Sequence, residues 1–189
     1  EYICGGYNCT NGLLGFVSEQ PDPKGEIQMG RMTLSGQKKK VYPVLLAGGT
    51  GTRLWPVSSD LHPKQLVRFM GKNTLIQDTI KRLEPVIDTE KIRIVCQEAH
   101  FHEIAKQIKE LGIEPEGQII CEPCGRNTAP AVLLAALKIQ QEETEAILCI
   151  FPADHVIENI NAFHRRIESA IELAARGYIV SFGIQPDYP

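Results

Sequence analysis

The sequence predicts an α/β fold in which a mainly parallel sheet lies between helical layers. Two observations predict it. Short apolar segments alternate with amphipathic segments through residues 41–189, a pattern typical of parallel strands joined by right-handed helical crossovers. A glycine-rich turn directly follows the first apolar segment, and parallel sheets bind ligands at the carboxyl ends of their strands. The fold is therefore predicted to be a Rossmann-like, three-layer sandwich.

Hydrophobic period and chain breakers define the elements in order. Residues 41–47 read as a buried strand, and apolar residues on one face of 74–83 predict a helix. Gly112 and Gly177 each follow a helical pattern, and Pro130 falls in the first turn of another, where proline is tolerated. The predicted strands are 41–47, 92–96, 118–121, 146–151 and 178–184, and the predicted helices are 74–83, 101–111, 129–140 and 163–175.

The first 40 residues differ from the remainder. They are rich in glycine, show no sustained period and end in the basic run 38–40. We expect residues 1–40 to form a poorly structured appendage and residues 41–189 to form the N-terminal part of a folded domain. Because Met32 precedes a short polar stretch and then the first strand, residues 1–31 are expected to be an upstream translation product or appendage.

Composition excludes several classes of protein. Hydrophobic residues make up 43% and charged residues 23% of the chain, which is ordinary for a globular protein. A net charge of −3 gives no reason to expect nucleic acid or an anionic membrane as a partner. No apolar stretch approaches the roughly 20 residues that span a bilayer, and no secretory segment opens the sequence. The cytoplasm is the expected compartment.

The six cysteines are too dispersed to predict a disulfide framework. Cys96 and Cys149 lie in apolar strand-like segments and are expected to be buried, inert thiols. Cys121 and Cys124 have the spacing of a zinc half-site or a redox pair, but no second pair at metal-binding spacing accompanies them. A zinc or thiol module at these two residues is therefore kept as the weaker alternative.

The glycine-rich turn within 45–56 predicts a polyphosphate site. Gly48, Gly49 and Gly51 allow close backbone approach to a ligand, and successive N–H groups in such a turn form an anion cradle. Arg53 and Lys64 add two cations. Two familiar glycine loops do not fit. No Lys-Ser/Thr pair follows as a P-loop requires, and the third glycine of a dinucleotide fingerprint is absent.

Three segments carry a resemblance to a known family: LAGGTGTRLWP at 46–56 with PKQ at 63–65, EPCGRNTAPA at 122–131, and FPADH at 151–155. With them, residues 41–189 resemble the mannose-1-phosphate guanylyltransferases, in particular the bacterial type often fused to a mannose-6-phosphate isomerase. The resemblance implies a nucleotide-diphospho-sugar transferase fold. It also implies Mg²⁺-dependent formation of GDP-mannose and pyrophosphate from GTP and mannose 1-phosphate, for polysaccharide biosynthesis.

The same resemblance implies roles for individual residues. Arg53 and Lys64 are the expected catalytic cations, and Asp154 is the expected Mg²⁺ ligand. Glu122 or nearby backbone is expected to read guanine. Thr128 has the alternative of capping the following helix, and His155 either orients Asp154 or packs locally. The expected nucleotide-binding residues are Leu46, Ala47, Gly48, Gly49, Gly51, Thr52, Arg53, Lys64, Glu122, Gly125, Arg126, Asn127 and Thr128.

Two departures from the family pattern limit what the chain is expected to do. Ser59 stands where family members usually have arginine, which predicts weaker phosphate binding. The family's sugar-binding segments and second metal-binding aspartate would follow Pro189, so we expect this chain to present the GTP half of the site without completing turnover. Oligomeric state is left open, with a homodimer as one option. The alternatives are a sugar-1-phosphate nucleotidyltransferase with another base or sugar, and a non-catalytic nucleotide-binding relative.

Overall fold

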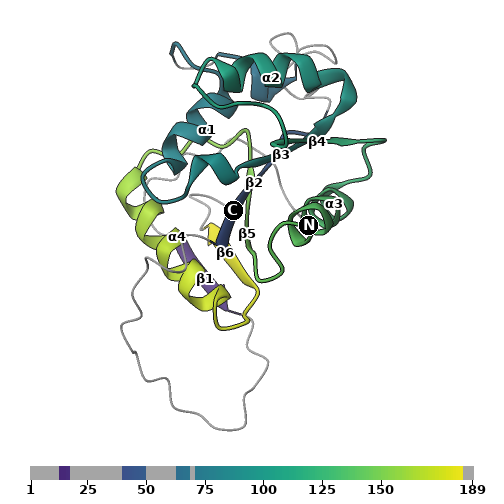
Figure 1. The fold of residues 1–189 in the computed structure, drawn as a ribbon. Coiled ribbons are helices and arrows are strands. Elements are labelled where there is room, and N and C mark those ends of the chain that lie inside the picture. The colour runs from purple at the N-terminus through teal and green to yellow at the C-terminus, as the bar shows by residue number, and fades with distance from the viewer. Residues whose placement is uncertain (1–12, 18–39, 50–62, 69–70, 185–189) are drawn as a thin grey trace, which may run out of the picture.

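The computed structural model describes residues 13–17, 40–49, 63–68 and 71–184. Its centre is a four-stranded sheet in the order β4-β3-β2-β5 (Figure 1). All neighbouring pairs in this sheet are parallel, which confirms the prediction from strand–helix alternation. The strands are β2 (Val41–Leu46), β3 (Arg93–Gln97), β4 (Ile119–Glu122) and β5 (Ile147–Pro152).

The helices form layers on both faces of this sheet. Helices α1, α2 and α4 lie on one face and α3 lies on the other (Figure 1), so the three-layer sandwich is confirmed. Their bounds are Leu75–Leu83 for α1, Phe101–Lys109 for α2, Thr128–Gln140 for α3 and Ile160–Ala174 for α4. Three 3₁₀ turns, η3 (Lys64–Leu66), η4 (Thr89–Lys91) and η5 (Glu98–His100), lie in the connections.

Strand β2 divides the core in two because successive side chains of a strand point to opposite faces. Val41 and Leu45 pack with α1, α2 and α4. Tyr42 and Val44 pack with Ala131, Ala135 and Ile139 of α3. A central strand that is buried on both faces has to be apolar throughout, which explains the unbroken hydrophobic run from residue 41.

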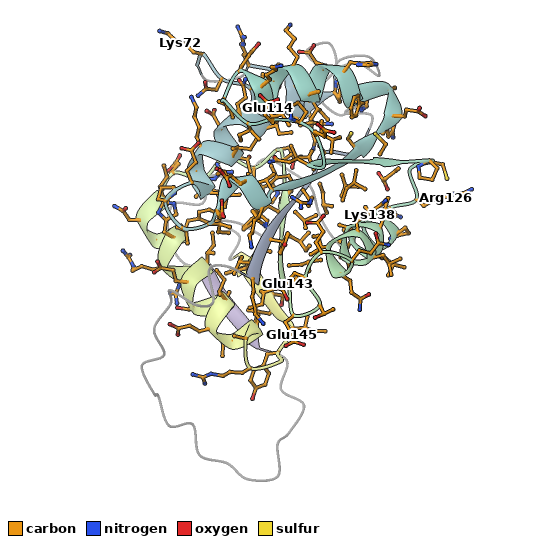
Figure 2. All side chains as sticks on the ribbon, viewed as in Figure 1. Lys72, Glu114, Arg126, Lys138, Glu143 and Glu145 are labelled. Atoms are coloured by element: carbon orange, nitrogen blue, oxygen red, sulfur yellow. The ribbon has the colours of Figure 1, made fainter. Side chains whose placement is uncertain are left out.

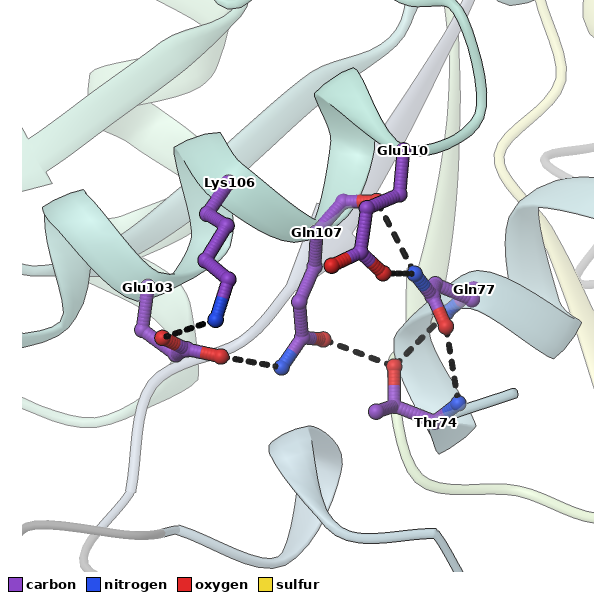
Figure 3. Close-up of polar contacts among 6 residues, drawn as sticks. All are labelled: Thr74, Gln77, Glu103, Lys106, Gln107 and Glu110. Carbon is purple, nitrogen blue, oxygen red and sulfur yellow. Dashed lines mark hydrogen bonds and ion pairs between the residues drawn. The ribbon is translucent and has the colours of Figure 1, made fainter. Parts of the chain in front are cut away.

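A buried polar network joins α1 to α2 (Figure 3). Thr74 caps α1 by accepting from the Gln77 N–H, and its hydroxyl donates to Gln107 Oε1 at 2.7 Å. The Gln77 amide donates to the Gln107 carbonyl at 3.0 Å and to Glu110 Oε2 at 2.9 Å. Gln107 Nε2 in turn donates to Glu103 Oε1 at 3.0 Å. The buried polar groups of this network therefore have partners, as the cost of burying them requires.

The last predicted strand does not join the parallel sheet. Strand β6 (Val180–Ile184) pairs antiparallel with β1 (Leu13–Val17) in a separate two-stranded sheet. The local pattern identified the strand correctly, but a short hydrophobic run does not specify its pairing partner. Residues 1–12 and 18–39 lie outside the described part of the chain, so the assignment of 1–40 as an appendage stays a prediction.

None of the helices in the described residues is both long enough and apolar enough to cross a membrane.

Candidate functional site

A cleft of about 340 Å³ lies at the carboxyl ends of the parallel strands. The ends of β2, β3 and β4 form its floor, and the loop after β4 and the first turn of α3 form its wall. Figure 2 shows Arg126 in this loop, pointing away from the body of the protein. The residues that line the cleft are Leu46, Gly48, Gly49, Val95, Gln97, Glu122, Gly125, Arg126, Asn127, Thr128 and Ala131.

Most of the described nucleotide-binding candidates lie in this cleft. The glycine turn and the segment that begins at Glu122 come from different parts of the sequence and meet at the same edge of the sheet, as predicted. Ala47 is buried and does not line the cleft, and its N–H donates to the Val95 carbonyl at 2.9 Å. Four residues that were singled out, Gly51, Thr52, Arg53 and Ser59, lie outside the described residues, and their roles stay predictions.

The glycine turn leaves little room for a side chain at Gly48 and has a backbone conformation that favours glycine at Gly49. A Cβ atom at Gly48 would lie 3.1 Å from Glu122 Oε2, a tight contact that the Glu122 carboxyl group would have to relieve by shifting a few tenths of an ångström. Gly49 has a φ of 118°, which residues with a side chain rarely adopt. The first two glycines of the turn therefore allow β2 to end directly against the carboxyl group on β4.

Gln65 joins the glycine turn to the segment that carries Lys64. Its side chain is only 2% exposed, and Nε2 donates to the Ala47 carbonyl at 2.5 Å. Gln65 belongs to the PKQ motif at 63–65, but its sequence context predicted no role for it, because a buried glutamine and a surface glutamine have the same local pattern. In the structure it fixes where η3 begins relative to the end of β2.

Lys64 and Asp154 form an ion pair. Lys64 comes from η3, and Asp154 follows the end of β5, which pairs with β2 up to Pro152. Both side chains are largely shielded from solvent, being 23% and 13% exposed. The structure thus brings together a predicted catalytic cation and the predicted metal ligand, although they are far apart in the sequence.

The donor set around Asp154 fits Mg²⁺ only if a ligand contributes oxygens. Among the described residues, no group of three or more His, Cys, Asp or Glu side chains is placed to hold a metal ion. Mg²⁺ binds through one or two carboxylates together with substrate phosphates and water, so a single aspartate beside a phosphate site suits it. A closed zinc site requires four protein ligands, and within the described chain Cys121 and Cys124 do not belong to such a group.

Arg82 holds the backbone of the loop that carries Asp154. From α1, its Nη2 donates to the His155 carbonyl at 3.2 Å, and its guanidinium lies 5.6 Å from the centre of the Phe163 ring. His155 therefore takes part through its main chain. The pKa of its imidazole is lowered, chiefly by burial; nearby Asp154 opposes this shift, and the Lys64 and Arg82 cations add to it.

Glu122 places a carboxyl group at the floor of the cleft. It ends β4 and is 8% exposed, and this burial raises its pKa. Gln97, at the end of β3, is its partner in the register of the two strands and also lines the cleft. No sequence motif indicated Gln97. Behind them Cys96 is buried, and burial together with Cys121 raises its pKa to about 12, in line with the predicted inert thiol.

Helix α3 begins at the wall of the cleft with a strained residue. Asn127 is the N-cap, with φ 74° and ψ −177°, and its side chain makes no capping hydrogen bond. This is backbone space that glycine almost alone occupies. Thr128 is the first helical residue, so the alternative that it caps the helix is wrong. The N–H groups of the first turn have no partners within the helix and carry the positive end of its dipole.

The site has three features of an enzyme class that transfers nucleotidyl groups. These are glycines that suit a phosphate, a lysine–aspartate pair, and a polar cleft at the carboxyl edge of a parallel sheet. The sequence model described as Nucleotidyl transferase matches residues 42–189, and the chain belongs to this family.

Its relatives define the particular branch. Mannose-1-phosphate guanylyltransferase from Escherichia coli K12 is 44% identical over 154 residues, and the enzyme of that name from Salmonella typhimurium is 43% identical over 155 residues. These alignments cover 80% and 81% of this chain but 32% of each relative, so the chain spans about a third of their length. A crystal structure titled mannose-1-phosphate geranyltransferase, from Thermus thermophilus, matches with a TM-score of 0.62 and 31% identity, over 73% of this chain and 39% of that one.

Proposed function

We propose that this chain is the nucleotide-binding part of a mannose-1-phosphate guanylyltransferase, with residues 41–189 as the N-terminal part of the catalytic domain. The reaction joins GTP to α-D-mannose 1-phosphate and gives GDP-mannose and pyrophosphate. The observation that carries the proposal is the Lys64–Asp154 pair, which Gln65 anchors beside the glycine turn. The names of the relatives at 42–44% identity support the choice of nucleotide and sugar.

In this reaction a sugar phosphate oxygen attacks the α-phosphorus of GTP. A new P–O bond forms while the bond to the pyrophosphate breaks, and catalysis depends on positioning and on stabilising charge. Lys64 is assigned to the α-phosphate as a point charge. Arg53 is assigned to the departing pyrophosphate, and the backbone at Gly48 and Gly49 to the phosphate chain. Glu122 is assigned to the N–H groups of guanine as their acceptor.

Asp154 is proposed to hold Mg²⁺, which when bound neutralises phosphate charge. In the free protein, Lys64 and Asp154 neutralise each other. A triphosphate would give the lysine a second anionic partner without moving it far, because the neighbouring Gln65 is already fixed to Ala47. The ion pair therefore holds the lysine near its working position before the ligand arrives.

The test is calorimetric titration of the chain with GTP and Mg²⁺. Lys64→Ala should weaken GTP binding about tenfold or more, since a hydrogen bond to a charged group contributes roughly 1.5–3 kcal/mol. Lys72→Ala removes an exposed lysine and should leave the affinity unchanged. Parallel titrations with UTP, dTTP and ATP address the choice of base. Equal affinity of the Lys64→Ala variant and the parent, or preference for another nucleotide, would contradict the proposal.

A further inference from the structure

Gln97 and Glu122 place two different polar groups side by side in the cleft. They are register partners at the carboxyl ends of β3 and β4, and neighbouring strands lie about 4.8 Å apart. Gln97 follows Val95 by two residues, and Glu122 follows Ile120 by two. Val95 and Ile120 both pack in the core beneath α3, so the alternation of a strand puts Gln97 and Glu122 on that same face.

Both polar groups lie against glycines in the loops that enclose the cleft. A Cβ atom at Gly125 would lie 3.2 Å from Gln97 Nε2, and one at Gly48 would lie 3.1 Å from Glu122 Oε2. A side chain at either glycine would occupy space beside a group that faces the cleft. The two glycines thus leave room for an amide donor and a carboxyl acceptor, one at each side of the cleft floor.

This donor–acceptor pair distinguishes among nucleobases. An ionised carboxylate only accepts hydrogen bonds, while a glutamine amide also donates two. Guanine presents, on one edge, two N–H donors next to a 6-oxo acceptor. Adenine presents a ring-nitrogen acceptor and an amino group on the same edge, so its lone pair would face the carboxylate. The arrangement of Glu122 and Gln97 therefore matches guanine and opposes adenine.

We propose that Gln97 is a specificity-determining residue whose Nε2 donates to the 6-oxo group of guanine while Glu122 accepts from the ring N–H and the 2-amino group. This inference rests on the proposed function, since it assumes that GTP occupies the cleft. It adds a residue that none of the sequence motifs contains. Gln97 discriminates against nucleotides that lack an oxygen acceptor at position 6, and Glu122 discriminates against those that lack the 2-amino donor.

The test changes one atom of the ligand together with one side chain of the protein. Affinities for GTP, 6-thio-GTP and ITP are measured by calorimetry for the parent chain and for Gln97→Met, which keeps the side-chain length but removes the amide. The parent should bind GTP about fivefold more tightly than 6-thio-GTP, because sulfur is a weak acceptor and one hydrogen bond is worth roughly 1 kcal/mol. Gln97→Met should bind both equally and keep the parent's preference for GTP over ITP.

Matched controls keep the outcome specific to Gln97. Gln140→Met changes an exposed glutamine at the end of α3 and should keep the parent's ratios, and Gln97→Leu provides a second variant if Gln97→Met does not fold. An undiminished preference of Gln97→Met for GTP over 6-thio-GTP would overturn the role of Gln97 and leave the proposed function standing. Failure of the parent chain to bind any of the three nucleotides would overturn the proposed function and this inference with it.

Discussion

At the end of β4, Glu122 keeps a carboxyl group where solvation is poor. Its 8% exposure raises its pKa, so the ionised form carries a desolvation cost in the free protein. Among the described residues its side chain has no hydrogen-bond donor to offset that cost. Binding sites commonly contain groups that lower the stability of the free protein, and the burial of Glu122 is consistent with the binding role proposed for it.

Replacing Glu122 by glutamine should therefore change how stability depends on pH. Because the folded-state pKa lies above the ordinary value of 4.5, the folded state binds the extra proton. The contribution of Glu122 to the free energy of unfolding is then largest below pH 4.5 and falls as pH rises through the folded-state pKa. Glu122→Gln should lose this fall, so the variant gains stability relative to the parent as pH increases.

Urea unfolding at a series of pH values, from below 4.5 to neutral, measures this difference. Glu116→Gln removes an exposed carboxyl group and is the matched control, for which the two stability profiles should stay parallel. If the stability profiles of Glu122→Gln and the parent were parallel, burial would not disfavour the ionised form of Glu122.

Asn127 pays a conformational cost that glycine would not. Its φ of 74° with ψ of −177° costs about 1–3 kcal/mol for a residue with a side chain. Asn127→Gly relieves this strain and adds some unfolded-state entropy, so the free energy of unfolding should rise by about 1 kcal/mol. Chemical denaturation measures the change. Asn127→Ala keeps the strain and should give no gain, and an equal gain in both variants would refute the strain argument.

At this scale the sequence pointed to charged residues and glycines rather than to amides, and the roles of all of them stay predictions. Gly48 is informative because the conformational freedom of glycine is needed at few positions, and Lys64 is informative because a positive charge beside a glycine turn serves few purposes. Gln65 and Gln97 were missed because a glutamine is informative only where it is buried or faces a cleft, and that depends on segments distant in the sequence.

The contact between α1 and α2 is a joint in which polar side chains of α1 and of its N-cap hold the two helices together. Thr74 serves both helices, since its hydroxyl accepts from the N-terminus of α1 and donates to Gln107 of α2 (Figure 3). Gln77 completes the capping box from the same turn. The packing angle of these two helices over the sheet therefore depends on polar groups as well as on the apolar core.

Thr74→Val should test this joint. The substitution nearly preserves shape but removes the cap and leaves Gln107 Oε1 without its donor, so we expect a loss of about 1–3 kcal/mol in the free energy of unfolding. Thr144→Val changes an exposed threonine and should have little effect. Thermal or urea unfolding measures the stability of both variants. Equal stability of the two variants would show that the network does not stabilise the fold.

Element type was predictable because caps and hydrophobic period are local, whereas α4 begins three residues before its predicted start. Helix α1 begins and ends within one residue of the prediction, and Pro130 lies in the first turn of α3 as expected. Pairing was less predictable. Strand β6 joins β1 rather than the parallel sheet, and register between distant segments depends on the energy of the whole fold.

At the scale of the whole molecule, the cleft is lined by residues of three strands and one helix, which come from separate segments of the sequence. A ligand that contacts β2, β3, β4 and α3 at once would stabilise the fold as a unit, because it binds the folded state only. GTP with Mg²⁺ at about 100 times its dissociation constant should add roughly 2.7 kcal/mol to the free energy of unfolding.

Thermal unfolding with and without GTP measures this gain, and Asp154→Asn provides the matched variant. Removal of Mg²⁺ with a chelator should reduce the shift in the parent chain but leave the smaller shift of Asp154→Asn unchanged. An equal effect of the chelator on both proteins would place the metal somewhere other than Asp154.

Among the described helices, α3 alone covers its face of the sheet. It packs there through Ala131, Ala135 and Ile139, which form one cluster with Val44, Val95 and Ile120. Because the first turn of the same helix is the wall of the cleft, the packing of these side chains in the hydrophobic core supports the position of that wall relative to the floor that carries Gln97 and Glu122. Larger side chains at these positions would widen the opening from beneath. Such a substitution in the core is therefore expected to change the nucleotide preference proposed for the cleft, with every polar group left in place.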